Sequence, residues 1–173
     1  MPLPGLGGPV GGPREATATY AAVVGEPRWL DEDQQEAWRK LVAVVTRLPA
    51  ALDTQLQRDA GLTHFGYWVL VHLSEAPDRT LRLNHLAAQA NASLSRLSHA
   101  LTRLENRGLI RRERNGRANV AVLTDAGYAE LVAAAPGHVD TVRSLVFDGL
   151  DTAEVRRLDE VCAALLAQLD RER

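Results

Sequence analysis

The sequence predicts a mainly α-helical fold with one small β-hairpin. From residue 31 onward, apolar side chains recur at steps of three and four residues, which is the spacing of one helix face. The pair Asn115-Gly116 lies between two short runs, one of which alternates, and this is a strong hairpin signal. A length of 173 residues with 46% hydrophobic residues suits one globular domain with helical extensions.

The N-terminal segment, residues 1–28, holds most of the prolines and many glycines without any period. Such a segment buries too little apolar surface to offset the entropy lost on ordering. We therefore expect a flexible tail.

A first long helix is predicted over residues 29–60. Its apolar stripe continues past Pro49, which kinks a helix without necessarily ending it, and Gly61 closes it. The stripe consists of Trp38, Leu41, Val42, Val45, Leu48, Leu52 and Leu56. Residues 63–73 are apolar nearly all round, so a second helix is expected to be buried on several sides and to end before Pro77.

Two short helices joined by a tight turn follow. Residues 83–90 form the first, and Asn91 tolerates the left-handed conformation that the turn needs. Residues 93–107 form the second, with Ser93 as its cap and Gly108 as its stop. Its buried face holds Leu97, Leu101 and Leu104. This pair is a helix-turn-helix, whose second helix reads DNA.

The other faces of the second helix carry short hydrogen-bonding and cationic side chains. They are Ser95, Arg96, Ser98, His99, Thr102 and Arg103. Arginine pairs with guanine in the major groove, and serine and threonine serve base edges or phosphates. Residues 93–117 have a net charge of +5 in a chain of net charge −2, which favours a local footprint on an anion. Taken alone, the face could equally be a solvated one, and the flanking elements favour the DNA-binding interpretation.

The predicted hairpin joins residues 109–114 to residues 118–123, with Arg114 and Arg117 near its tip. Together with the preceding helices, it makes a winged helix-turn-helix domain over residues 61–124.

Residues 125–173 are predicted to be helical. Thr124 caps a helix whose stripe continues across Pro136, and Asp151 and Glu154 form a capping box for the last helix. The two stripes are Tyr128, Val132, Ala135, Val139, Val142 and Val146, and Val155, Leu158, Cys162, Leu165 and Leu169. They either pack on the chain's own domain or cover a second subunit, and Cys162 is expected to pack inertly.

Several motifs between residues 83 and 127 resemble one known family. They are Leu86-Ala87, Ser95-Arg96-Leu97-Ser98-His99, Arg103-Leu104-Glu105, Arg107-Gly108-Leu109-Ile110-Arg111-Arg112 and Val122-Leu123-Thr124-Asp125-Ala126-Gly127. In these motifs the chain looks like a MarR-family transcriptional regulator. The resemblance implies a homodimer, interlocked through residues 29–60 and 125–173, that binds a palindromic operator in double-stranded DNA, more often as a repressor.

The resemblance also implies a cleft for a small aromatic or phenolic effector. Trp38, Trp68 and His72 are the candidate lining residues, although a helical core uses the same residue types. The chain departs from the family in two places. Its wing tip, Asn115-Gly116-Arg117, is short and lacks an acidic residue before the arginine, and Leu94 stands in the first helical turn where a polar residue is expected.

The DNA contacts are assigned by position. Base reading is expected from Ser95, Arg96, His99 and Thr102, with Arg103 either reading bases or bracing the wing. Phosphate contacts are expected from Ser93, Ser98 and Arg112, and a minor-groove contact from Arg117 with help from Arg114.

The sequence favours no enzyme, metal site or cofactor. Ser98 and His99 point about 100° apart on a helix, so they cannot form a nucleophile and its base. His64 and His72 are too far apart to chelate one metal as an i, i+4 pair does, and buried, hydrogen-bonded roles are expected for both. With one cysteine and no apolar run of membrane-spanning length, a cytoplasmic location is expected. The remaining alternative is a helical protein-interaction module that does not bind DNA.

Overall fold

The computed structural model describes residues 28–116 and 118–171, so the predicted tail lies outside the described residues apart from Arg28. The chain forms two compact units, Met1–Arg47 and Leu48–Arg173. In the first unit, the described residues include the N-terminal part of helix α2 (Glu32–Ala60). The apolar side chains Trp38, Leu41, Val42 and Val45 of this part are exposed. All other elements belong to the second unit.

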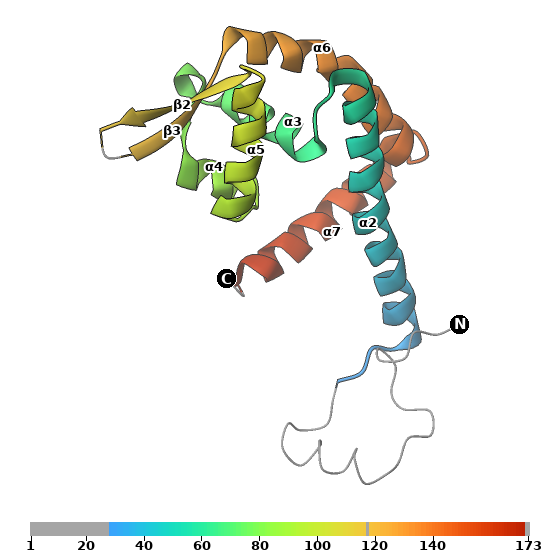
Figure 1. Ribbon diagram of the computed structural model, residues 1–173. Coiled ribbons are helices and arrows are strands. Elements are labelled where there is room, and N and C mark those ends of the chain that lie inside the picture. The colour runs from blue at the N-terminus through green and yellow to red at the C-terminus, as the bar shows by residue number, and fades with distance from the viewer. Residues whose placement is uncertain (1–27, 117, 172–173) are drawn as a thin grey trace, which may run out of the picture. The chain divides into compact units, whose positions relative to one another are not determined.

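The second unit has the predicted mainly α-helical architecture with a hairpin (Figure 1). After the end of α2 come α3 (His64–Glu75), the 3-10 turn η1 (Pro77–Arg79), β1 (Thr80–Arg82), α4 (Leu83–Gln89), α5 (Leu94–Asn106), β2 (Ile110–Asn115), β3 (Ala118–Leu123), α6 (Asp125–Val142), the π-helical turn η2 (Arg143–Phe147) and α7 (Thr152–Arg171). None of the described helices has the length and apolar character needed to cross a membrane.

The three strands form an antiparallel sheet in the order β1-β3-β2. Asn115 pairs with Ala118, so Asn115 belongs to β2, and the two strands of the wing, β2 and β3, are joined beyond it. The predicted Asn115-Gly116 turn is therefore wrong by one residue. Gly116 has a φ of 61°, a left-handed conformation that glycine adopts without strain. Strand β1 is absent from the predicted elements, because three residues carry no pattern until they pair with β3.

One hydrophobic core lies under the helix-turn-helix and the sheet. The predicted buried face of α5 is confirmed, because Leu97, Leu101 and Leu104 are all buried. The core consists of Leu56, Leu62, Tyr67, Val69, Leu70, Leu73, Leu86, Ala87, Leu97, Leu101, Leu104, Leu109, Ile110, Ala121, Leu123, Leu131 and Ala134. These contacts orient α5 with its polar face outward.

The wing is fixed to helix α6 at a close junction. Thr124 caps α6 as predicted, accepting a hydrogen bond from the backbone N–H of Gly127 at 3.0 Å, and its hydroxyl lies 2.7 Å from the carbonyl of Gly108. A Cβ at Gly127 would lie 1.9 Å from the carbonyl oxygen of Leu109. Only glycine fits there, so this junction defines where the wing leaves the core.

The C-terminal helices leave much apolar surface open. Helix α6 continues through Pro136 and buries Leu131, Ala134 and His138, whereas Tyr128, Val132 and Val139 of the predicted stripe are exposed. The capping box of α7 is confirmed, because Asp151 accepts from the N–H of Glu154 at 2.8 Å. None of the described residues of α7 is buried. Cys162 is exposed, so the prediction that it packs is wrong for the single chain.

Candidate nucleic-acid interface

The reading helix α5 is built as predicted. Its cap Ser93 accepts a hydrogen bond from the backbone N–H of Arg96 at 3.2 Å. The predicted contact residues on its outer face are all exposed: Ser95, Arg96, Ser98, His99, Thr102 and Arg103. Thr102 donates its hydroxyl to the carbonyl of Ser98, so part of its hydrogen-bonding capacity is used within the helix.

The turn before α5 sets its angle to α4. Asn91 takes a φ of 48°, which confirms the predicted left-handed turn residue. The N–H of Ala92 donates to the carbonyl of Ala87 at 2.9 Å and closes the turn. Ala90 is buried at the junction, so the two helices are packed against each other closely.

Arg96 rests against α3. Its guanidinium carbon lies 4.4 Å from the centre of the Phe65 ring, within the range of a cation–π interaction. The N–H donors of a guanidinium lie in its own plane, so stacking on an aromatic ring does not use them. Arg96 can therefore donate to a base or phosphate while it remains stacked on Phe65.

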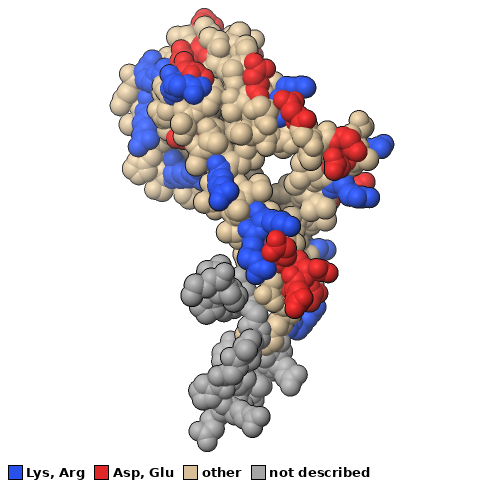
Figure 2. Space-filling view, turned by 90° about the vertical axis from the view of Figure 1, so that its right-hand side faces the viewer, with Lys and Arg blue, Asp and Glu red and all other residues tan. Residues whose placement is uncertain are grey.

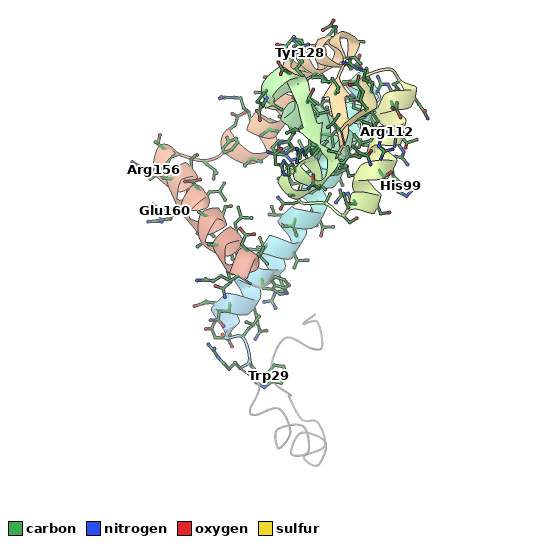
Figure 3. The ribbon with its side chains drawn as sticks, turned by 90° about the vertical axis from the view of Figure 1, so that its left-hand side faces the viewer. Trp29, His99, Arg112, Tyr128, Arg156 and Glu160 are labelled. Carbon is green, nitrogen blue, oxygen red and sulfur yellow. The ribbon has the colours of Figure 1, made fainter. Side chains whose placement is uncertain are left out.

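Arg112 joins the wing to the reading helix. Its backbone N–H and its Nε donate to the carboxylate of Glu105 at 3.0 and 2.8 Å. These hydrogen bonds lower the pKa of Glu105 below its usual range, which keeps the carboxylate charged. The predicted phosphate contact of Arg112 would have to be made beside this ion pair. Figure 3 shows Arg112 and His99 along the same edge of the fold.

The rest of the wing is strongly basic. Arg111 is paired with Glu113 on the same strand, and Arg114 is exposed. Arg117, the predicted minor-groove residue, lies outside the described residues. Figure 2 shows several basic side chains along the left edge of the upper part of the fold, while other basic side chains lie beside acidic ones elsewhere.

A groove of about 720 Å³ lies between α5, the start of α3 and the end of α2. Arg96, Arg103 and Arg107 provide its cationic groups beside the imidazole of His99, and Leu62, Phe65 and Leu104 provide apolar surface. Asp53 also lines the groove, and its carboxylate accepts a hydrogen bond from the backbone N–H of His64 at 2.8 Å. Such a groove suits a small anion with an apolar body.

The predicted effector residues are only partly brought together. Trp68 and His72 contact each other edge to face, with ring centres 5.0 Å apart, and Trp68 is 43% exposed. Nε2 of His72 is buried without a hydrogen-bond partner among the described residues, so the predicted hydrogen-bonded role is wrong at this atom. Trp38 is in the first unit and is 44% exposed.

A buried polar cluster was not predicted. His138 stacks on Tyr67 with ring centres 4.5 Å apart, and its Nδ1 lies 3.3 Å from Oε1 of Gln55. Burial, with a further contribution from nearby His64, lowers the pKa of His138. No local pattern could reveal the cluster, because Gln55 and His138 are 83 residues apart. The described residues contain no group of three or more side chains suited to hold a metal ion.

Comparison with solved structures gives close matches over most of the chain. Sco3205, a MarR family transcriptional regulator from Streptomyces coelicolor solved in complex with DNA, is 46% identical, with a TM-score of 0.80 over 83% of this chain and 92% of its own. AbsC, a MarR family transcriptional regulator from the same organism, is 37% identical, with a TM-score of 0.79 over 85% of this chain and 100% of its own. The transcriptional regulator BldR from Sulfolobus solfataricus is 19% identical with a TM-score of 0.69 over 80% of this chain and 99% of its own, and shares the fold. No family model and no curated protein matches the chain.

Proposed function

Because the chain belongs to the MarR family of transcriptional regulators, we propose that it is a homodimeric repressor that binds a palindromic operator through α5. Members of this family regulate transcription and are not enzymes. The observation that carries the proposal is the outer face of α5, where six polar or cationic side chains are exposed over three buried leucines. The similar Sco3205 was solved with DNA bound.

The residue roles follow the geometry of a helix in the major groove. Base contacts are assigned to Ser95, Arg96, His99 and Thr102, with Arg103 beside them, and all five are exposed. Phosphate contacts are assigned to Ser93, Ser98 and Arg112. Arg117, supported by Arg114, is assigned to the minor groove beside the wing.

Dimerisation is proposed for residues 29–60 and 125–173, on either side of the DNA-binding residues 61–124. Its support is the exposed apolar surface of α7, where Leu158, Val161, Leu165, Leu166 and Leu169 are each more than a third exposed. Monomeric proteins seldom leave so continuous an apolar helix face in water. A two-fold dimer would present two copies of α5 to half-sites about one helical turn, roughly 34 Å, apart.

Release by a small aromatic or phenolic effector is part of the same proposal. It is supported by the exposed edge of Trp68 beside His72 and by the groove next to α5. Such a ligand releases DNA only if it binds more tightly to a dimer whose reading helices are wrongly spaced. A panel of phenolic compounds should therefore weaken DNA binding, and Trp68→Ala should reduce that effect if the ligand contacts Trp68. Compounds that change neither DNA binding nor the melting temperature would contradict effector control.

Selection of binding sites from a pool of randomised duplexes tests the main proposal. The selected sequences should converge on an inverted repeat whose half-site centres lie about 10 base pairs apart. A pool that fails to converge would contradict sequence-specific binding. A protein with no affinity for any duplex would favour the alternative of a helical interaction module.

A further inference from the structure

Leu94 is the first residue of the reading helix, directly after the cap Ser93, and it is 60% exposed. The other leucines of α5 are at most 3% exposed, so the core makes full use of them. Leu94 contributes little to this core. A large apolar side chain at the N-terminal end of a reading helix stands where base edges are contacted.

The surroundings of Leu94 combine apolar and hydrogen-bonding groups. It lines a shallow groove with Ser98, one turn further along α5, and with residues from the start of α4, from β1 and from the wing. The groove residues are Arg82, Leu83, Asn84, Leu94, Ser98, Ala118 and Asn119. None of these is acidic, and four offer hydrogen-bonding groups. The groove therefore provides apolar surface from Leu94, Leu83 and Ala118 beside groups that suit phosphates and base edges.

Thymine is the one base that presents an apolar group, its 5-methyl, in the major groove. Leucine has no hydrogen-bonding group, so it can distinguish bases there only through this methyl. A protein partner would need a larger continuous apolar patch than Leu94 and the half-buried Leu83 provide. We propose that Leu94 contacts a thymine methyl in each half-site and is a specificity-determining residue. The proposal rests on the proposed function, because it requires α5 to lie in the major groove.

Substitution of deoxyuridine for thymidine tests the proposed contact of Leu94, because the two nucleotides differ only in the 5-methyl group. In an operator obtained by selection, each thymine is replaced in turn by deoxyuridine, in symmetric pairs, and the affinity is measured by fluorescence anisotropy. For wild type, replacement at one symmetric pair of thymines should weaken binding by about fourfold per half-site. This is the effect expected when one methyl group is removed from an apolar contact. Leu94→Ser should lose a similar factor on the thymine operator and should not respond to deoxyuridine at that pair.

Two controls make the result specific to Leu94. Leu94→Met keeps an apolar side chain and should still respond to deoxyuridine at the same pair. Ser95→Ala, at the next position of the helix, should lower affinity without removing the response. Because Leu94 is exposed, its variants should keep the wild-type melting temperature, which shows that they fold.

Equal deoxyuridine responses in wild type and Leu94→Ser would overturn the assignment while leaving DNA recognition by α5 intact. The same conclusion follows if Leu94→Ser weakens the operator and a scrambled duplex equally, since this would mark a contact with the DNA backbone. A selection that yields no specific duplex would overturn both the assignment and the proposed function.

Discussion

The carboxylate of Glu105, near the end of the reading helix, accepts hydrogen bonds from the backbone N–H and the side chain of Arg112 in the wing. The two residues are seven positions apart, and Gly108, with a φ of 69°, reverses the chain between them. This ion pair fixes the wing relative to α5. The spacing of the two proposed DNA contacts, α5 in the major groove and the wing in the minor groove, should therefore depend on it.

Glu105→Gln should loosen this link. Both side chains are about one-third exposed, so the expected loss in free energy of unfolding is only about 1 kcal/mol. The affinity for operator DNA should fall several-fold because the wing is less well positioned. Chemical denaturation and anisotropy titration measure the two effects. Glu113→Gln is the matched control, since it breaks an ion pair within β2 and leaves the helix–wing link intact; equal DNA affinities of the two variants would contradict the positioning role.

The same ion pair predicts a pH dependence. The pKa of Glu105 is lowered from about 4.5, so its stabilising effect is complete above that pH and is lost as the pH falls through the lowered pKa. The difference in unfolding free energy between wild type and Glu105→Gln should therefore shrink below pH 4.5. A difference that stays constant down to pH 3 would show that the charge of Glu105 is not involved.

His138 should make stability depend on pH in a higher range. Its pKa is lowered below 6.5, chiefly by burial, so the unfolded chain binds the proton more readily. The free energy of unfolding should fall as the pH drops from 7.5 through 6.5. His138→Gln should reduce this slope, and His64, whose pKa is also lowered by burial, accounts for what remains. A wild-type slope in His138→Gln would contradict the assignment.

Arg96→Ala should weaken operator binding by about 1 to 3 kcal/mol and relax the preference at one base pair. The variant also loses the stacking on Phe65, so the melting temperature is measured in parallel. Competition between operator variants measures the base preference. Arg58→Ala removes an exposed arginine at the end of α2 and should change neither property. Equal weakening on all duplexes would reassign Arg96 to a phosphate.

Gly127→Ala should destabilise the fold by about 3 kcal/mol, because the new Cβ would overlap the carbonyl of Leu109 at the junction of wing and α6. Gly149→Ala has open space around its Cβ and should have little effect. Thermal unfolding of the two variants makes the comparison. Equal melting temperatures would show that the junction adjusts easily.

Leu165→Asp should dissociate the proposed dimer, because it places a charge in the exposed apolar stripe of α7. Ala163→Asp adds the same charge on another face of the helix, about 160° around the axis from Leu165. Sedimentation velocity should show a monomer for the first variant and a dimer for the second. A Leu165→Asp protein that sediments as wild type does would place the interface elsewhere.

Local patterns predicted most of the DNA-binding elements. The leucine spacing of α5, its cap Ser93 and the left-handed Asn91 depend on neighbours in sequence, and all three are confirmed. The Asn-Gly pair places the loop of the wing one residue too early. The end of the hairpin is set by the register of β2 on β3, in which Asn115 still pairs with Ala118.

Interactions between distant residues could not be predicted. Strand β1 exists only through its pairing with β3, about 40 residues later. The contact of His138 with Gln55 joins two helices that no short pattern relates. The sequence places an apolar residue, Leu94, where a polar one is expected. The structure adds that Leu94 is exposed and lies beside hydrogen-bonding side chains.

Anisotropy titration of wild-type protein tests the central claim most directly, with a selected operator and a scrambled duplex of the same composition at two salt concentrations. A dimer that reads DNA through α5 should bind the operator about a thousandfold or more tightly than the scrambled duplex, and both affinities should fall steeply as salt rises. Equal affinity for the two duplexes, or binding that does not respond to salt, would contradict the claim.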